Sequence, residues 1–85
     1  VRDTEEAIHQ ANNTRYGLGA SLWTQDDHKA REIIPLLEVG NVYINSPVRS
    51  HPHMPYGGIK KSGYGREFSE FGLREFVNIK SVVFK

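Results

Sequence analysis

The segment PYGGIKKSGYGRE, residues 55–67, has the highest density of residue types suited to ligand chemistry. It holds four glycines and three cations, a composition typical of loops that wrap around phosphate. A phosphate-binding loop needs Gly-Lys-Ser/Thr after a glycine and four further residues, because the lysine reaches the outer phosphates and the hydroxyl holds magnesium. Counting from Gly58 leads to Gly63, but Tyr64 and Gly65 follow it. The Gly63-x-Gly65 spacing also lacks the third glycine of a dinucleotide-binding fingerprint, so neither nucleotide interpretation is favoured.

The same loop carries cations and aromatic rings that could suit nucleic acid. Lys60, Lys61 and Arg66 are interleaved with Tyr56 and Tyr64, and such residues can contact phosphates and stack on bases. The whole chain, however, has 11 Lys and Arg against 10 Asp and Glu, for a net charge of +1. Because no overall field attracts a polyanion, we favour a solvated loop whose glycines supply positive φ. We therefore expect neither nucleic acid nor a membrane as a partner.

Metal binding and acid–base catalysis are also weakly supported. His51 and His53 flank a proline that limits their convergence, and no acidic third ligand lies nearby, so surface histidines are favoured over a metal site. Glu67 and Glu70 lie at an expected helix start, where the dipole favours carboxylates for structural reasons alone. The chain has no cysteine, so these residues supply no disulfide, thiolate ligand or thiol nucleophile.

Short helices and strands must position this loop. Ala30, Ile33 and Leu37 share the spacing of one buried helix face, which is the clearest periodicity in the chain. The expected elements are helices over 3–12, 26–40 and 67–78, strands over 20–24, 41–45 and 80–85, and a long loop over 46–66. Their order, α-β-α-β-loop-α-β, predicts an α/β arrangement. Loops of about twenty residues usually work at a site or an interface.

Several residues mark where the first two helices begin and end. Asp3 opens a capping box whose glutamate, three residues later, is expected to reach back to it. Asp26 or Asp27 can cap the second helix. Pro35 removes an amide donor and crowds the preceding turn, so we expect a kink or an early end. Gly40 suits a left-handed stop after this helix.

Length and composition predict one small domain with a marginal core. A chain of 85 residues with 38% apolar content buries only about 60% of its unfolded surface. No apolar run approaches the roughly 18 residues of a membrane span, and no signal sequence is evident near Val1, so we expect a soluble, cytoplasmic protein. The last strand would need a partner from another chain or a missing domain, as in a piece cut from a larger protein.

Three blocks of sequence closely resemble the C-terminal part of the aldehyde dehydrogenase superfamily. They are YGLGASLWT at residues 16–24, GNVYIN at residues 40–45 and the glycine-rich block at residues 55–67. Their order and spacing agree with the family across nearly the whole chain. Arg49, Ser50 and the stretch 69–80 look most like bacterial succinate-semialdehyde dehydrogenases.

The resemblance implies an enzyme that oxidises an aldehyde, with succinate semialdehyde expected, to the carboxylic acid, using NAD or NADP. In the family the nucleophile is a cysteine and a glutamate activates water. This chain lacks that cysteine, so we expect the nucleophile, the general base and the cofactor domain to lie upstream. These residues alone are then inactive and include no catalytic, cofactor or metal residue. Residues 1–78 would be the C-terminal part of the catalytic domain with the following helix, and residues 79–85 the strand that forms a homo-oligomer.

The resemblance also assigns substrate contacts. Tyr56 stands where the family usually has a phenylalanine lining the substrate tunnel, with plain packing as the alternative. Ser50 lies at the tunnel mouth, where a serine in succinate-semialdehyde enzymes resembles a ligand for the distal carboxylate. Arg49 could supply charge to that carboxylate, or could be solvated or paired at an interface. Some relatives hold a monovalent cation on backbone carbonyls that would map onto Lys60 and Gly63, which the sequence leaves open.

The alternative hypothesis is a stand-alone oligomerisation or interaction module without catalysis. It would use the terminal strand and the long loop to associate. Dehydrogenase turnover and the mass of the chain in solution separate the two hypotheses.

Overall fold

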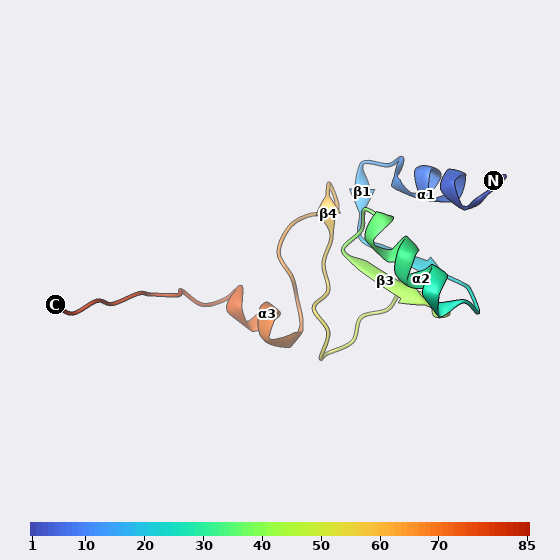
Figure 1. The fold of residues 1–85 in the computed structure, drawn as a ribbon. Coiled ribbons are helices and arrows are strands. Elements are labelled where there is room, and N and C mark those ends of the chain that lie inside the picture. Colours follow the sequence, from blue (N-terminus) through green and yellow to red (C-terminus); the bar gives the residue numbers. More distant parts are fainter.

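The computed structural model describes residues 1–85, and the elements follow one another along the chain as drawn in Figure 1. Short helices and short strands alternate over the first 44 residues, and irregular segments dominate the rest. The elements are α1 (Thr4–Asn12), β1 (Tyr16–Gly17), β2 (Gly19–Leu22), α2 (Asp27–Ile33), the 3₁₀ turn η1 (Ile34–Leu36), β3 (Asn41–Ile44), β4 (Ile59–Lys60) and α3 (Ser69–Arg74).

Two small sheets organise the strands. β2 and β3 pair in parallel, with Gly19 opposite Asn41, and α2 with η1 forms the crossover between them, as a parallel pair requires. β1 and β4 pair antiparallel, with Tyr16 opposite Lys60. The second pair brings the glycine-rich loop back onto the N-terminal half of the chain. The expected α/β arrangement is confirmed, although β1 and β4 were not predicted.

The core is small and lies under α2. Only five residues are buried, and the apolar ones among them are Ala30 at 3% and Ile33 at 7% exposure. Both belong to the helix face that the periodicity predicted. No large side chain is fully buried, so packing within these 85 residues stabilises the arrangement only weakly.

The helix starts follow the predicted capping residues, with one correction. The Asp3 carboxylate accepts the amide of Glu6 at 2.8 Å, and Asp26 caps α2 by accepting the amide of Lys29 at 3.0 Å. The Glu6 carboxylate does not return to Asp3. It accepts the amide of Arg2 at 2.6 Å, because the cap residue is extended and the amide of the residue before it lies within reach.

The second helix ends early, as Pro35 predicts, but Gly40 does not have the left-handed conformation that was expected after it. α2 stops at Ile33, and Pro35 lies inside the 3₁₀ turn that follows. Gly40 is not a left-handed stop, since the positive-φ glycines are Gly63 and Gly65. Gly40 is required for close approach instead: a Cβ there would lie 1.9 Å from the carbonyl oxygen of Gly57.

The C-terminal part differs most from the prediction. The helix expected over 67–78 is limited to Ser69–Arg74, because Phe68 and Ser69 both have positive φ and delay its start. Residues 75–77 form the turn that ends α3, and residues 78–85 extend away from the other elements (Figure 1) and contain no paired strand. The strand expected there requires a second chain, so it and the boundary at residue 79 stay predictions. No helix is long and apolar enough to span a membrane.

Candidate substrate-facing loop

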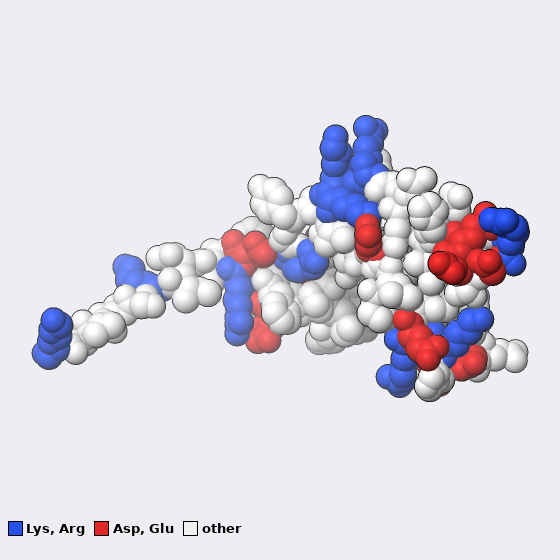
Figure 2. Space-filling view, turned by 45° about the horizontal axis from the view of Figure 1, so that its top comes forward, with Lys and Arg blue, Asp and Glu red and all other residues white.

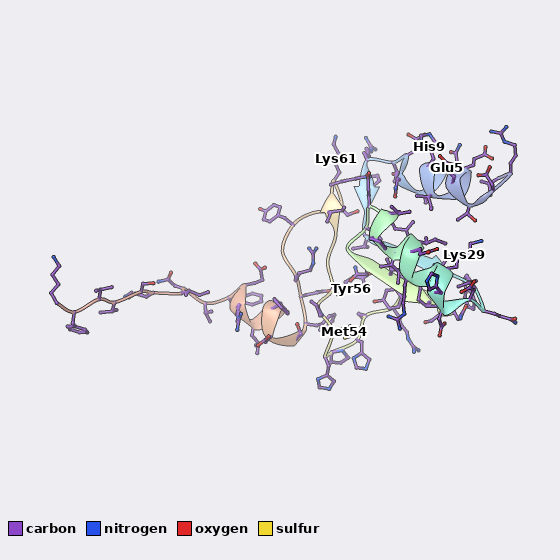
Figure 3. The ribbon with its side chains drawn as sticks, viewed as in Figure 1. Glu5, His9, Lys29, Met54, Tyr56 and Lys61 are labelled. Carbon is purple, nitrogen blue, oxygen red and sulfur yellow. The ribbon has the colours of Figure 1, made fainter.

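Tyr56 is held in the glycine-rich loop by backbone pairing. Its amide donates to the carbonyl of Glu67 at 2.9 Å, and the amide of Glu67 donates back at 2.8 Å. In Figure 3 Tyr56 lies between Met54 at the far turn of the loop and Lys61 beside β4. The Tyr56 side chain is half-buried and lines an open cavity of about 360 Å³ together with Arg66. Tyr56 is therefore a wall residue of a hollow on this loop.

Two of the three loop cations have structural partners. The ammonium of Lys60 donates to the carbonyls of Asn12 at 3.0 Å and Thr14 at 3.3 Å, and it forms an ion pair with Glu38. It thereby connects β4 to the C-terminal end of α1, where a cation is favoured. Lys60 therefore has a structural role, and so does Arg66, described next.

Arg66 donates to backbone carbonyls inside its own loop. Its Nη1 atom donates to the carbonyl of Gly58 at 3.0 Å and to the carbonyl of Gly65 at 2.6 Å. Its amide donates to the Glu75 carboxylate at 3.3 Å. The guanidinium is thus engaged by the protein and part-buried.

The turn after β4 is closed by its own backbone. The amide of Gly63 donates to the carbonyl of Lys60 at 3.4 Å, and the Ser62 hydroxyl accepts the amide of Gly17 at 2.9 Å. The Lys60 carbonyl, which the resemblance would assign to a monovalent cation, thus already accepts a hydrogen bond within the turn.

Arg49 and Ser50 lie in an exposed segment between β3 and the glycine-rich loop. Both side chains are exposed, and neither lines the hollow that contains Tyr56. The three predicted substrate contacts are therefore carried by one continuous loop but are not gathered in one cavity of this chain. The histidines of the same segment lie on the surface as expected, with the rings of His51 and His53 5.6 Å apart.

Asn45 fixes the base of this exposed segment. Its amide group donates to the carbonyl of Thr24 and accepts the amide of the same residue, both at 2.8 Å. Thr24 lies two residues after β2 and Asn45 directly follows β3, so these hydrogen bonds close the ends of both parallel strands.

Three residues that build the site gave little signal in the sequence. Asn41 donates from Nδ2 to the carbonyls of Leu18 at 2.8 Å and Gly57 at 2.7 Å. Asn12 donates to the carbonyl of Leu36 at 2.7 Å and accepts the amide of Glu38 at 2.8 Å. Glu75 lay inside an expected helix. Their contacts are distant in sequence, so only the fold brings the partners together.

The surface charge around these elements is mixed. Figure 2 shows cations interspersed with carboxylates over the visible face, apart from one group of cations that projects from it. With a net charge of +1, local contacts rather than a general field decide what this surface binds.

The sequence model of the aldehyde dehydrogenase family matches residues 1–82 of this chain. The chain belongs to the aldehyde dehydrogenase family. Succinate-semialdehyde dehydrogenase [NADP(+)] 1 from Mycobacterium ulcerans is 52% identical over 80 residues, which cover 94% of this chain and 18% of that protein. An aldehyde dehydrogenase from Paenarthrobacter nicotinovorans is 49% identical over 82 residues, which cover 96% of this chain and 18% of that protein.

Solved aldehyde dehydrogenase structures contain the same arrangement. Succinic semialdehyde dehydrogenase from Streptococcus pyogenes, solved with NADP+, superposes with a TM-score of 0.88 at 46% identity, covering 92% of this chain and 17% of that one. Gox0499 superposes with a TM-score of 0.95 at 40% identity, covering 100% of this chain and 19% of that one. The family resemblance and its leaning toward succinate-semialdehyde dehydrogenases are confirmed. The chain spans less than a fifth of the length of these relatives.

Proposed function

We propose that this chain forms the substrate-facing loop and part of the subunit contact of an NAD(P)-dependent aldehyde dehydrogenase that oxidises succinate semialdehyde. The observation that carries the proposal is the 52% identity to a succinate-semialdehyde dehydrogenase over 94% of the chain. The cofactor follows from relatives whose names or structures specify NADP+ or NAD+. In this proposal, the parts of the enzyme outside these residues bind that cofactor and supply the nucleophile.

The role proposed for the exposed segment is recognition of the substrate carboxylate. Ser50 has no hydrogen-bond partner within the chain and lies next to Arg49, so a hydroxyl donor and a guanidinium are both available to an anion. Charge-assisted hydrogen bonds of this kind are stronger than neutral ones. Tyr56 contributes a half-buried ring, which suits the apolar chain between the carboxylate and the aldehyde.

Comparing two aldehydes in the full-length enzyme tests the carboxylate contact. Ser50→Ala is expected to raise the KM for succinate semialdehyde about tenfold, because a hydrogen bond to a charged group contributes roughly 1.5–3 kcal/mol. The KM for butanal, which has the same chain length without the carboxylate, should stay within about twofold.

Ser21→Ala is the matched control for Ser50→Ala. Ser21 is also exposed, but it lies on β2, away from the loop. It should change neither KM. Equal effects of Ser50→Ala on both aldehydes would contradict the carboxylate role while leaving aldehyde oxidation itself intact.

A further inference from the structure

The two glycines that follow Tyr56 pose a structural problem. A Cβ at Gly57 would lie 2.5 Å from the carbonyl oxygen of Gly65, and a Cβ at Gly58 would lie 2.5 Å from the Ser62 side chain. Packing therefore excludes any larger residue at both positions. Glycine, however, leaves the backbone free to rotate, and such freedom beside Tyr56 would leave its ring poorly oriented.

Two side-chain donors restrict the backbone of Gly57 and Gly58. Asn41 at the start of β3 donates to the carbonyl of Gly57 at 2.7 Å, and Arg66 donates to the carbonyl of Gly58 at 3.0 Å. The backbone of Tyr56 is paired in both directions with Glu67. Three consecutive residues are thus held from two different parts of the chain, and we call Asn41 and Arg66 the carbonyl clamp.

We infer that the carbonyl clamp positions Tyr56 toward the substrate, so that Arg66 and Asn41 act on aldehyde binding without touching the aldehyde. The inference rests on the proposed function, in which Tyr56 lines the substrate path. Arg66 suits this role because its Nη1 atom contacts two carbonyls at once, and the planar guanidinium fixes the directions of both N–H donors. A lysine keeps the charge but not these fixed directions.

A double-mutant cycle in the full-length enzyme tests the inference. Arg66→Lys is expected to raise the KM for the aldehyde about tenfold with a smaller change in kcat and none in the KM for the nucleotide, since misorientation of a binding group weakens substrate binding. In a Tyr56→Ala background the same substitution should have no further effect. Effects that multiply in the double variant would overturn the inference, because Arg66 would then act independently of Tyr56.

Arg31→Lys is the matched control. Arg31 is exposed on α2, and its side chain makes no hydrogen bond or ion pair. The control should leave all kinetic constants unchanged. A rise in the aldehyde KM equal to that of Arg66→Lys would assign the effect to general stability and would overturn the inference.

Amide hydrogen exchange separates the clamp from the enzymatic proposal. Arg66→Lys should speed exchange at residues 56–58 about tenfold, while Arg31→Lys should not. If the wild-type enzyme failed to oxidise aldehydes, the proposed function would fall, yet faster exchange would still support the clamp. Unchanged exchange would overturn it in either case. If Arg66→Lys does not fold, Asn41→Ala serves the same measurements, because it removes one clamp donor and keeps the Asn41 backbone bond to Leu18.

Discussion

Gly40 occupies the point where the backbone before β3 passes closest to the glycine-rich loop. Its amide donates to the carbonyl of Gly17 at 3.1 Å, and the carbonyl oxygen of Gly57 occupies the space that a Cβ would need. A single methyl group at this position therefore has to displace a backbone, not a flexible side chain. The residue that resembled a helix stop is in fact a packing requirement of the site loop.

Gly40→Ala is expected to destabilise the full-length protein by about 1–3 kcal/mol, the usual cost of overpacking. The displaced carbonyl of Gly57 should also weaken its bond from Asn41, so protection from exchange should fall around residue 57. The measurement is the denaturant midpoint, followed by exchange at the loop. Gln25→Ala, at an exposed position without hydrogen bonds, should stay within about 0.5 kcal/mol. Equal midpoints for the two variants would show that the loop moves aside without cost.

At the scale of elements, α2 is the helix whose start the sequence could define only to within one residue. Asp26 and Asp27 were equal candidates for the cap, because either could place an oxygen near a free amide. In the structure Asp26 is extended and accepts the amide of Lys29, whereas Asp27 is the first helical residue. The two neighbouring carboxylates therefore have different roles.

Asp26→Ala should destabilise α2 by about 1 kcal/mol, which corresponds to about fivefold faster amide exchange within Asp27–Ile33. Asp27→Ala removes only a favourable interaction with the helix dipole, and it should cost about 0.3–1 kcal/mol at most. Exchange measured by mass spectrometry on the two variants makes the comparison. A larger effect for Asp27→Ala than for Asp26→Ala would contradict the assignment of Asp26 as the cap.

The helices and the parallel strands were predictable because their signals are local. Caps such as Asp3, the apolar face at Ala30 and Ile33, and the ring of Pro35 all act within a few residues of their own position. β1 and β4 were missed because two-residue strands have no periodicity, and their pairing joins positions more than 40 residues apart. The shortened α3 depends on positive φ at Phe68, which no residue type there suggests.

The sequence predicted where along the chain the candidate site lies, but not the contacts that hold it in place. The glycines and cations marked the loop at residues 55–67, and the resemblance singled out Tyr56. The donors that hold the loop, Asn41 and Arg66, contact carbonyls, which carry no sequence signal. Their roles follow only from coordinates, because any residue can offer a backbone carbonyl.

At the scale of the whole molecule, the chain is elongated rather than compact. Its radius of gyration is 16.5 Å, whereas a compact domain of this length has about 12 Å. The longest axis is 62 Å, and the extended residues 78–85 account for much of it. Phe76 and Phe84 are each 91% exposed, which leaves an apolar row that a second chain could cover.

The 85-residue chain alone is expected to self-associate and to show no aldehyde oxidation. Association follows from the exposed apolar row, and inactivity follows from the proposal that the nucleophile and the cofactor domain lie outside these residues. Light scattering and an assay with succinate semialdehyde and NADP or NAD measure the two properties. Turnover by this chain would contradict the proposal that the nucleophile and the cofactor domain lie outside these residues.

Phe84→Asp should lower the self-associated fraction, because it replaces an exposed apolar side chain of the expected strand contact by a charge. Asn78→Asp adds the same charge just before residues 79–85 and should leave the mass unchanged. A monomeric wild-type chain, or equal effects of the two variants, would argue against the terminal strand as the contact.

Glu75 connects the glycine-rich loop to the C-terminal end of the chain. Its carboxylate accepts the amide of Arg66, and it is also the C-cap residue of α3, three residues before the extended segment 78–85 begins. Tension along residues 78–85 would act on the end of α3 and, through Glu75, on Arg66, which clamps Gly58. Docking of this segment on a neighbouring subunit would stiffen the loop in its own subunit, and release of the segment would loosen it. Assembly and substrate affinity would then rise and fall together.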